Sequence, residues 1–140
     1  MPRPDKSLDA SVRSRASDTC EYCVLPQSVR RLRFHVEHIL PRQHGGNDDL
    51  DNLALACGRC NRHKGPNIAG IDPVTGQMTR LFHPRTDRWS EHFRWNGPLA
   101  VGLTPIGRTT VEVLLMNQPD EIAIREELIA SDRFPPQPPC

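Results

Sequence analysis

The period of apolar and polar positions changes repeatedly along this 140-residue chain, which predicts short helices and strands. In the N-terminal half the pattern predicts a helix capped by Ser7 or Asp9, two strands separated by a Gly-rich loop, and a second short helix that Gly65 ends. In order, the segments are residues 8–16, 30–39, 45–49, 52–56 and 61–64, with residues 1–9 expected to be largely disordered.

The pattern after residue 66 predicts a different arrangement, in which three strands form a small antiparallel sheet and two helices follow. The turn signal is Asp-Pro-Val-Thr-Gly at residues 72–76. The expected strands are residues 78–82, 89–95 and 99–103, and the expected helices are residues 107–116 and 121–130. Asp120 and Glu121 suit the first turn of the last helix, where the helix dipole favours negative charge.

Composition indicates an ordinary globular protein that needs help to hold its core. The chain is 36% hydrophobic and 25% charged, and its 14 prolines and 9 glycines interrupt any large core, so a covalent or metal staple is expected. No apolar run is long enough for a membrane helix, and the N-terminus has no secretory apolar segment. The sequence thus predicts no membrane association and a cytoplasmic location.

Charge is distributed unevenly between the two halves. The net charge is only +1, but residues 1–66 carry 11 Lys and Arg against 8 Asp and Glu, and residues 67–140 carry 7 against 9. Of the 18 basic residues, 16 are Arg, the side chain suited to bidentate phosphate contacts. Contact with a nucleic acid is therefore expected in the N-terminal half.

Four of the five cysteines form two C-x-x-C pairs, which predict a tetrahedral zinc site. The expected ligands are Cys20, Cys23, Cys57 and Cys60. Two disulfides are disfavoured without a secretory signal, and a redox C-x-x-C normally has one pair on a thioredoxin-like pattern. Cys140 ends a Pro-rich tail and is expected to take no part.

The segment between the cysteine pairs carries residues suited to hydrolytic chemistry. Glu37 and His38 lie at the end of the first expected strand, Asn52 begins the second, and Asn61 follows Cys60. A carboxylate and an amide oxygen suit a hard divalent cation, and an imidazole beside them suits a general base. Because neighbours on a regular strand point to opposite faces, we expect a frayed or bulged strand end near Pro41 that brings Glu37 and His38 to one site.

Together these motifs resemble the zinc-knuckle branch of the HNH endonucleases. The resemblance rests on Val-Glu-His-Ile-x-Pro at residues 36–41, Gly-Gly at 45–46, Asn-Leu at 52–53, and Cys-x-x-Cys-Asn-x-x-Lys-Gly at 57–65. The remainder also resembles the C-terminal extension of a bacterial HNH subgroup. The resemblance implies an α+β fold: a ββα-metal finger with a four-Cys zinc site, followed by a small αβ extension.

The resemblance also implies a role for each residue of the motif. His38 would be the general base that activates water, and Glu37 and Asn61 would hold a catalytic Mg²⁺ or Mn²⁺. Asn52 would fix the loop between the strands and so orient the base. Position 37 is often Asp in the family, and position 61 is often His, so this chain departs mildly at both.

The expected function is metal-dependent hydrolysis of DNA phosphodiester bonds, and the family resemblance implies products with 5′-phosphate and 3′-hydroxyl ends. RNA is an alternative substrate, and double-strand cleavage would require a homodimer or two visits by one molecule. Five residues are placed to contact flanking phosphates, namely Arg42, Arg59, Arg62, His63 and Lys64. The alternatives are a non-catalytic zinc-finger adaptor that binds nucleic acid and a protein-interaction module.

The expected organisation has four parts. These are an N-terminal tail and short helix (1–17), the nuclease domain (18–70), the extension (71–133) and a Pro-rich tail (134–140).

Overall fold

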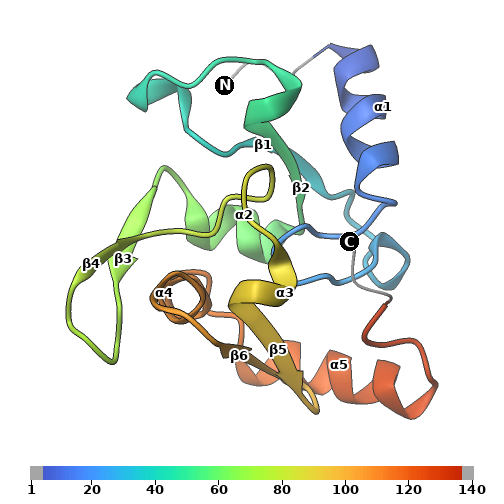
Figure 1. The fold of residues 1–140 in the computed structure, drawn as a ribbon. Coiled ribbons are helices and arrows are strands. Elements are labelled where there is room, and N and C mark those ends of the chain that lie inside the picture. Colours follow the sequence, from blue (N-terminus) through green and yellow to red (C-terminus); the bar gives the residue numbers. More distant parts are fainter. Residues whose placement is uncertain (1–4, 137–140) are drawn as a thin grey trace.

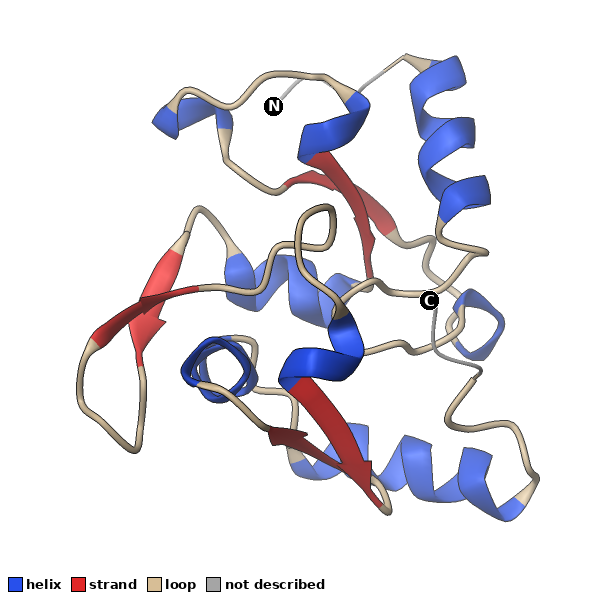
Figure 2. Cartoon of the chain, in the orientation of Figure 1, coloured by secondary structure: helices blue, strands red, loops and turns tan. Residues whose placement is uncertain are grey.

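The fold, seen in a computed structural model that describes residues 5–136, is a mixed α/β structure with three small two-stranded sheets (Figures 1 and 2). Its N-terminal elements are α1 (Lys6–Arg15), β1 (His35–His38), β2 (Leu53–Ala56) and α2 (Gly58–Lys64), with 3-10 turns at Gln27–Val29, Arg42–His44 and Leu50–Asn52. The expected α+β class is confirmed. The tail at 137–140, with Cys140, and residues 1–4 lie outside the described residues.

The first helix begins earlier than expected because Asp5 caps it. The Asp5 carboxylate accepts hydrogen bonds from the backbone N–H groups of Ser7 and Leu8, both at 2.9 Å. This is the standard satisfaction of free N–H groups at a helix start. The predicted caps, Ser7 and Asp9, are therefore wrong, and the helix extends into the segment expected to be disordered.

The two central strands pair in antiparallel register, with Glu37 opposite Ala54 and His38 opposite Leu53. All four residues of β2 are buried, because the cysteine cluster and the helices cover the strand. The expected strand over 30–39 is shortened to its last part. The Gln27 side chain accepts from Phe34 N and donates to Leu32 O, so this stretch bonds to a side chain instead of a strand.

The pairing at the end of β1 is regular, and the expected bulge there is wrong. After the His38–Leu53 pair, Ile39 N donates to Asn52 O at 2.8 Å, so the ladder continues without an inserted residue. Consecutive side chains on a regular strand leave it on opposite faces. Glu37 and His38 therefore meet different neighbours.

The C-terminal part consists of hairpins and helices instead of one small sheet. Its elements are β3 (Ala69–Ile71), β4 (Met78–Arg80), α3 (Trp89–His92), β5 (Phe93–Asn96), β6 (Leu99–Gly102), α4 (Pro105–Val113) and α5 (Pro119–Ala130). The predicted turn at 72–76 folds β4 back onto β3. The sequence pattern did not predict β3. β5 pairs only with β6, and the expected strand over 89–95 begins as helix α3, so the predicted three-stranded sheet is wrong.

The C-terminal part shares one core with the N-terminal part. Phe82, Trp89 and Phe93 belong to the same buried cluster as Tyr22 and the cysteines. The Trp89 indole N–H donates to Tyr22 O at 2.8 Å, and the Tyr22 and Phe82 rings meet edge to face at 6.3 Å. The expected extension therefore covers the first cysteine pair.

Ion pairs add to this contact. Arg59 bonds Asp120 at 2.7 Å and Glu121 at 3.2 Å, at the start of α5. Arg30 forms an ion pair with the same Glu121, and Arg85 forms one with Glu21.

None of the described helices has the length and apolar character that crossing a bilayer requires.

Gly107 of α4 lies close against the backbone of His92 and supplies a test of this packing. A Cβ at Gly107 would lie 1.9 Å from the backbone oxygen of His92, whereas one at Gly58 would meet nothing within 4 Å. We expect Gly107→Ala to lose about 3 kcal/mol of unfolding free energy, because backbone must move. Urea denaturation measures the loss. Gly58→Ala is the control and should be neutral or slightly stabilising, since Ala favours a helix; equal midpoints for the two variants would contradict this packing.

Candidate nuclease site

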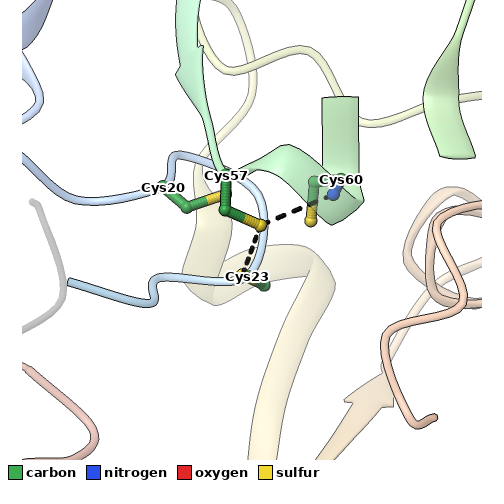
Figure 3. Close-up of side chains that lie close together, drawn as sticks. All are labelled: Cys20, Cys23, Cys57 and Cys60. Carbon is green, nitrogen blue, oxygen red and sulfur yellow. Dashed lines mark hydrogen bonds between the residues drawn. The ribbon is translucent and has the colours of Figure 1, made fainter. Parts of the chain in front are cut away.

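The four paired cysteines converge on one buried point (Figure 3). Their sulfur atoms all lie within 4.8 Å of one another. Cys20 and Cys23 come from the loop after α1, whereas Cys57 caps the N-terminus of α2 and Cys60 lies in its first turn. The predicted convergence of the two pairs is confirmed.

The geometry and the electrostatics of this cluster suit a divalent cation. A tetrahedral Zn²⁺ with bonds of about 2.3 Å separates its sulfurs by about 3.8 Å. The Sγ atoms of Cys23 and Cys57 are 3.8 Å apart. Contact with Cys20, above all, raises the pKa of Cys23 and of Cys60 and lowers that of Cys57, because neighbouring thiols compete for negative charge. A bound cation would relieve that competition.

His38 is buried at the end of β1 and faces the loop that follows it. Its Nε2 lies 2.7 Å from Oδ1 of Asp48, and Arg42 binds both oxygens of that carboxylate at 2.6 and 2.8 Å. The hydrogen bond to His38, and then Arg42, hold the pKa of Asp48 below its ordinary value. Asp48 is therefore ionised at neutral pH. Its carboxylate accepts the hydrogen bond that orients the imidazole.

Glu37 points the other way, into a buried group of polar side chains. Tyr22 donates its hydroxyl to Oε1, and the Lys64 ammonium lies 3.2 Å from Oε2. Burial raises the pKa of Glu37, while Lys64 and Tyr22 oppose that rise. Burial and the neighbouring charge of Glu37 also raise the pKa of Tyr22, so the phenol keeps its proton and donates.

Lys64 ties this group to the end of β1. Its ammonium also donates to the carbonyl oxygens of His38 at 3.3 Å and Ile39 at 3.0 Å. The side chain is almost fully buried. Lys64 therefore has no access to a flanking phosphate in this arrangement, contrary to the expectation from its position in the sequence.

Asn52 holds the loop between the strands at three points. Its amide oxygen accepts from Leu40 N at 2.8 Å, and its amide nitrogen donates to Leu40 O and Asn47 O at 3.0 and 2.8 Å. Gly46 makes this close contact feasible, because a Cβ there would lie 1.7 Å from Leu40 O. The loop that carries Arg42 and Asp48 is thereby set over His38.

The remaining predicted residues lie on α2. Asn61 is half-buried one turn before Lys64, and its side chain has no hydrogen bond within residues 5–136. Arg62 is exposed and His63 is half-buried, whereas Arg59 is turned toward α5 by its pairs with Asp120 and Glu121.

Two residues of the site, Asp48 and Tyr22, were not expected from the sequence. Asp48 contacts His38, and Tyr22 contacts Glu37. Asp48 belongs to an acidic run with Asp49 and Asp51, and nothing in that run distinguishes the one that meets His38. Tyr22 had a usable signal, because it is the only tyrosine of the chain and lies inside the first C-x-x-C pair.

Comparison with known proteins places this site in a family. Residues 20–67 match the family model described as HNH endonuclease. These residues form an HNH endonuclease domain. The chain is also 29% identical over 118 residues to the Septu protein PtuB of Bacillus thuringiensis, an alignment covering 83% of this chain and 43% of that protein. This chain thus spans less than half the length of that relative, and no solved structure matched it.

Glu37 and Asn61 offer side-chain oxygen atoms of the kind that divalent cations bind. An ionised carboxylate has about four lone-pair sites. Each oxygen of Glu37 has one polar partner, Tyr22 at Oε1 and Lys64 at Oε2. The side-chain oxygen of Asn61 is free of hydrogen bonds to the described residues. Carboxylate and amide oxygens are ordinary ligands of hard cations, so these residues fit Mg²⁺ or Mn²⁺.

The buried ion pair of the HNH domain can be tested by a double-mutant cycle. Lys64→Met leaves the Glu37 carboxylate buried without its ammonium partner and should cost about 3–5 kcal/mol of unfolding free energy. Adding Glu37→Gln removes the stranded charge and should recover part of that loss. Urea denaturation of the zinc-loaded proteins measures the unfolding free energy of the two single variants, Lys64→Met and Glu37→Gln, and of the double variant.

The other lysine of the chain provides the control for that cycle. Lys6 is exposed, so Lys6→Met should leave stability nearly unchanged. Strict additivity of Lys64→Met and Glu37→Gln would mean that the two side chains do not interact as described.

Proposed function

We propose that this protein is a metal-dependent HNH endonuclease that hydrolyses DNA phosphodiester bonds. The observation that carries the proposal is the setting of His38 in the HNH domain. The imidazole ends β1 and hydrogen-bonds an ionised Asp48 at 2.7 Å. A histidine oriented by a carboxylate is the arrangement of a general base.

His38 takes the proton from the attacking water. In the tautomer whose Nε2 donates to the ionised Asp48, Nδ1 holds the lone pair that receives the proton of water. Asp48 then stabilises the imidazolium that forms. Asn52 keeps this pair in place by holding the intervening loop.

Glu37 and Asn61 are the proposed ligands of the catalytic cation, Mg²⁺ or Mn²⁺. When bound, such a cation stabilises the negative charge that develops on the phosphate and on the departing oxygen. Glu37 and His38 occupy the last two positions of β1 and face opposite sides.

The proposed DNA contacts come from the surface of the HNH domain. Arg62 and His63 are open to phosphates, whereas Arg42 and Arg59 would first exchange Asp48 and Asp120 for them. RNA is the alternative substrate to be tested beside DNA. A homodimer is the assembly that would allow one complex to cleave both strands.

The proposed occupant of the four-cysteine cluster is a structural Zn²⁺. We expect one zinc per chain by elemental analysis of the purified protein, and a lower thermal midpoint after chelation, because apo thiols lose the bonds that join the two pairs. Cys60→Ser should lose most of the metal, whereas Cys140→Ser, which changes the one cysteine that belongs to neither C-x-x-C pair, should keep it. Full zinc in Cys60→Ser would exclude this assignment.

Plasmid cleavage tests the catalytic proposal directly. With Mg²⁺ or Mn²⁺ the protein should nick supercoiled DNA, and excess EDTA should abolish nicking. His38→Ala should lower the rate by about 10²–10⁴, the usual contribution of a general base. Gel quantification of nicked circles over time gives the rate.

A second histidine of the same strand is the control. His35 is exposed, so His35→Ala should retain most of the activity. If wild type and His38→Ala are equally inactive although they keep zinc and bind DNA, the non-catalytic adaptor replaces the nuclease. If neither binds DNA at low salt, the interaction module does.

A further inference from the structure

Tyr22 is a buried residue of the loop that carries the first cysteine pair. It lies between Cys20 and Cys23 in the sequence, and its side chain is 1% exposed. The Phe82 and Tyr22 rings meet edge to face, and the Trp89 indole N–H donates to the backbone oxygen of Tyr22 at 2.8 Å. The direction of the phenol is therefore determined by the cysteine loop and by the C-terminal part together.

The hydroxyl of Tyr22 ends at the carboxylate of Glu37. Oε1 of Glu37 accepts from this hydroxyl, and Oε2 faces the Lys64 ammonium. Glu37 thus has one donor from the first cysteine loop and one from α2. Both donors belong to segments that also carry cysteines of the cluster.

We propose that Tyr22 is a positioning residue that couples the four-cysteine site to the metal-binding carboxylate of Glu37. The cluster orients Tyr22, and Tyr22 fixes the carboxylate in the rotamer that binds the catalytic cation. The inference rests on the proposed function, in which Glu37 is a ligand. Groups that hold a metal ligand in place commonly change metal affinity by about 10–100-fold when they are removed.

The chain offers a direct spectroscopic probe of this coupling, because Tyr22 is its only tyrosine. Uniform incorporation of 3-fluorotyrosine gives a single ¹⁹F signal in the zinc-loaded protein. Titration with Mg²⁺ should shift that signal to saturation, and Glu37→Gln should abolish the shift. A signal that stays in place while Mg²⁺ supports cleavage would overturn the proposal and leave the nuclease standing.

Tyr22→Phe removes only the hydroxyl and tests the energetic consequence. We expect it to keep one zinc per chain and to weaken Mn²⁺ binding, measured by electron paramagnetic resonance, by about tenfold. Thr109→Val is the matched control, because it also removes a buried hydroxyl, one without a hydrogen-bond partner in the described part of the chain. Its Mn²⁺ affinity should equal that of wild type.

The outcomes separate this inference from the proposed function. Unchanged Mn²⁺ affinity in Tyr22→Phe would overturn the positioning role even if the nuclease is active. Identical Mn²⁺ binding by wild type and Glu37→Gln would remove Glu37 as a ligand, and the inference with it. If Tyr22→Phe does not fold, the fluorine titration of the wild-type chain decides.

Discussion

Four thiols from two segments far apart in the sequence converge on one buried point, and the placement of the neighbouring elements follows from this convergence. It joins the loop after α1 to the start of α2, and so sets α2 against β1 and β2. A chain with 14 prolines and 9 glycines makes only short elements, whose packing alone would position them poorly. Every side chain of the proposed site lies on a segment between or beside those thiols, so its geometry follows from their meeting point.

The second feature is the buried ion pair between Lys64 and Glu37, which depends on the cysteine cluster for its position. Removing a carboxylate and an ammonium from water is costly, and a pair is tolerated only when its remaining hydrogen bonds are made. Lys64 meets this condition with Glu37 and two backbone carbonyls, and Glu37 meets it with Lys64 and Tyr22. Such a group holds its shape because any departure leaves a buried charge unpaired, which suits a carboxylate proposed to bind a cation.

The C-terminal part supports the HNH domain from outside. Its aromatic side chains cover the first cysteine loop, and its acidic helix start takes up Arg30 and Arg59. The predicted boundary between residues 70 and 71 falls inside β3, which pairs with β4. The basic surface of the N-terminal half is therefore smaller than its sequence indicates, because part of it is neutralised within the molecule.

Residue type and spacing alone predict the cysteine cluster, the order β1–β2–α2, and the HNH motif with His38 and Asn52. These are local patterns, and a C-x-x-C turn or a strand before a Gly-Gly loop keeps its meaning wherever it occurs. Long-range packing selects the acidic residue that meets His38, brings Tyr22 and Lys64 to Glu37, and turns Arg59 toward α5. Those contacts join residues 10 to 61 positions apart. Which members of a run of equal charges are brought together depends on packing, which no local pattern encodes.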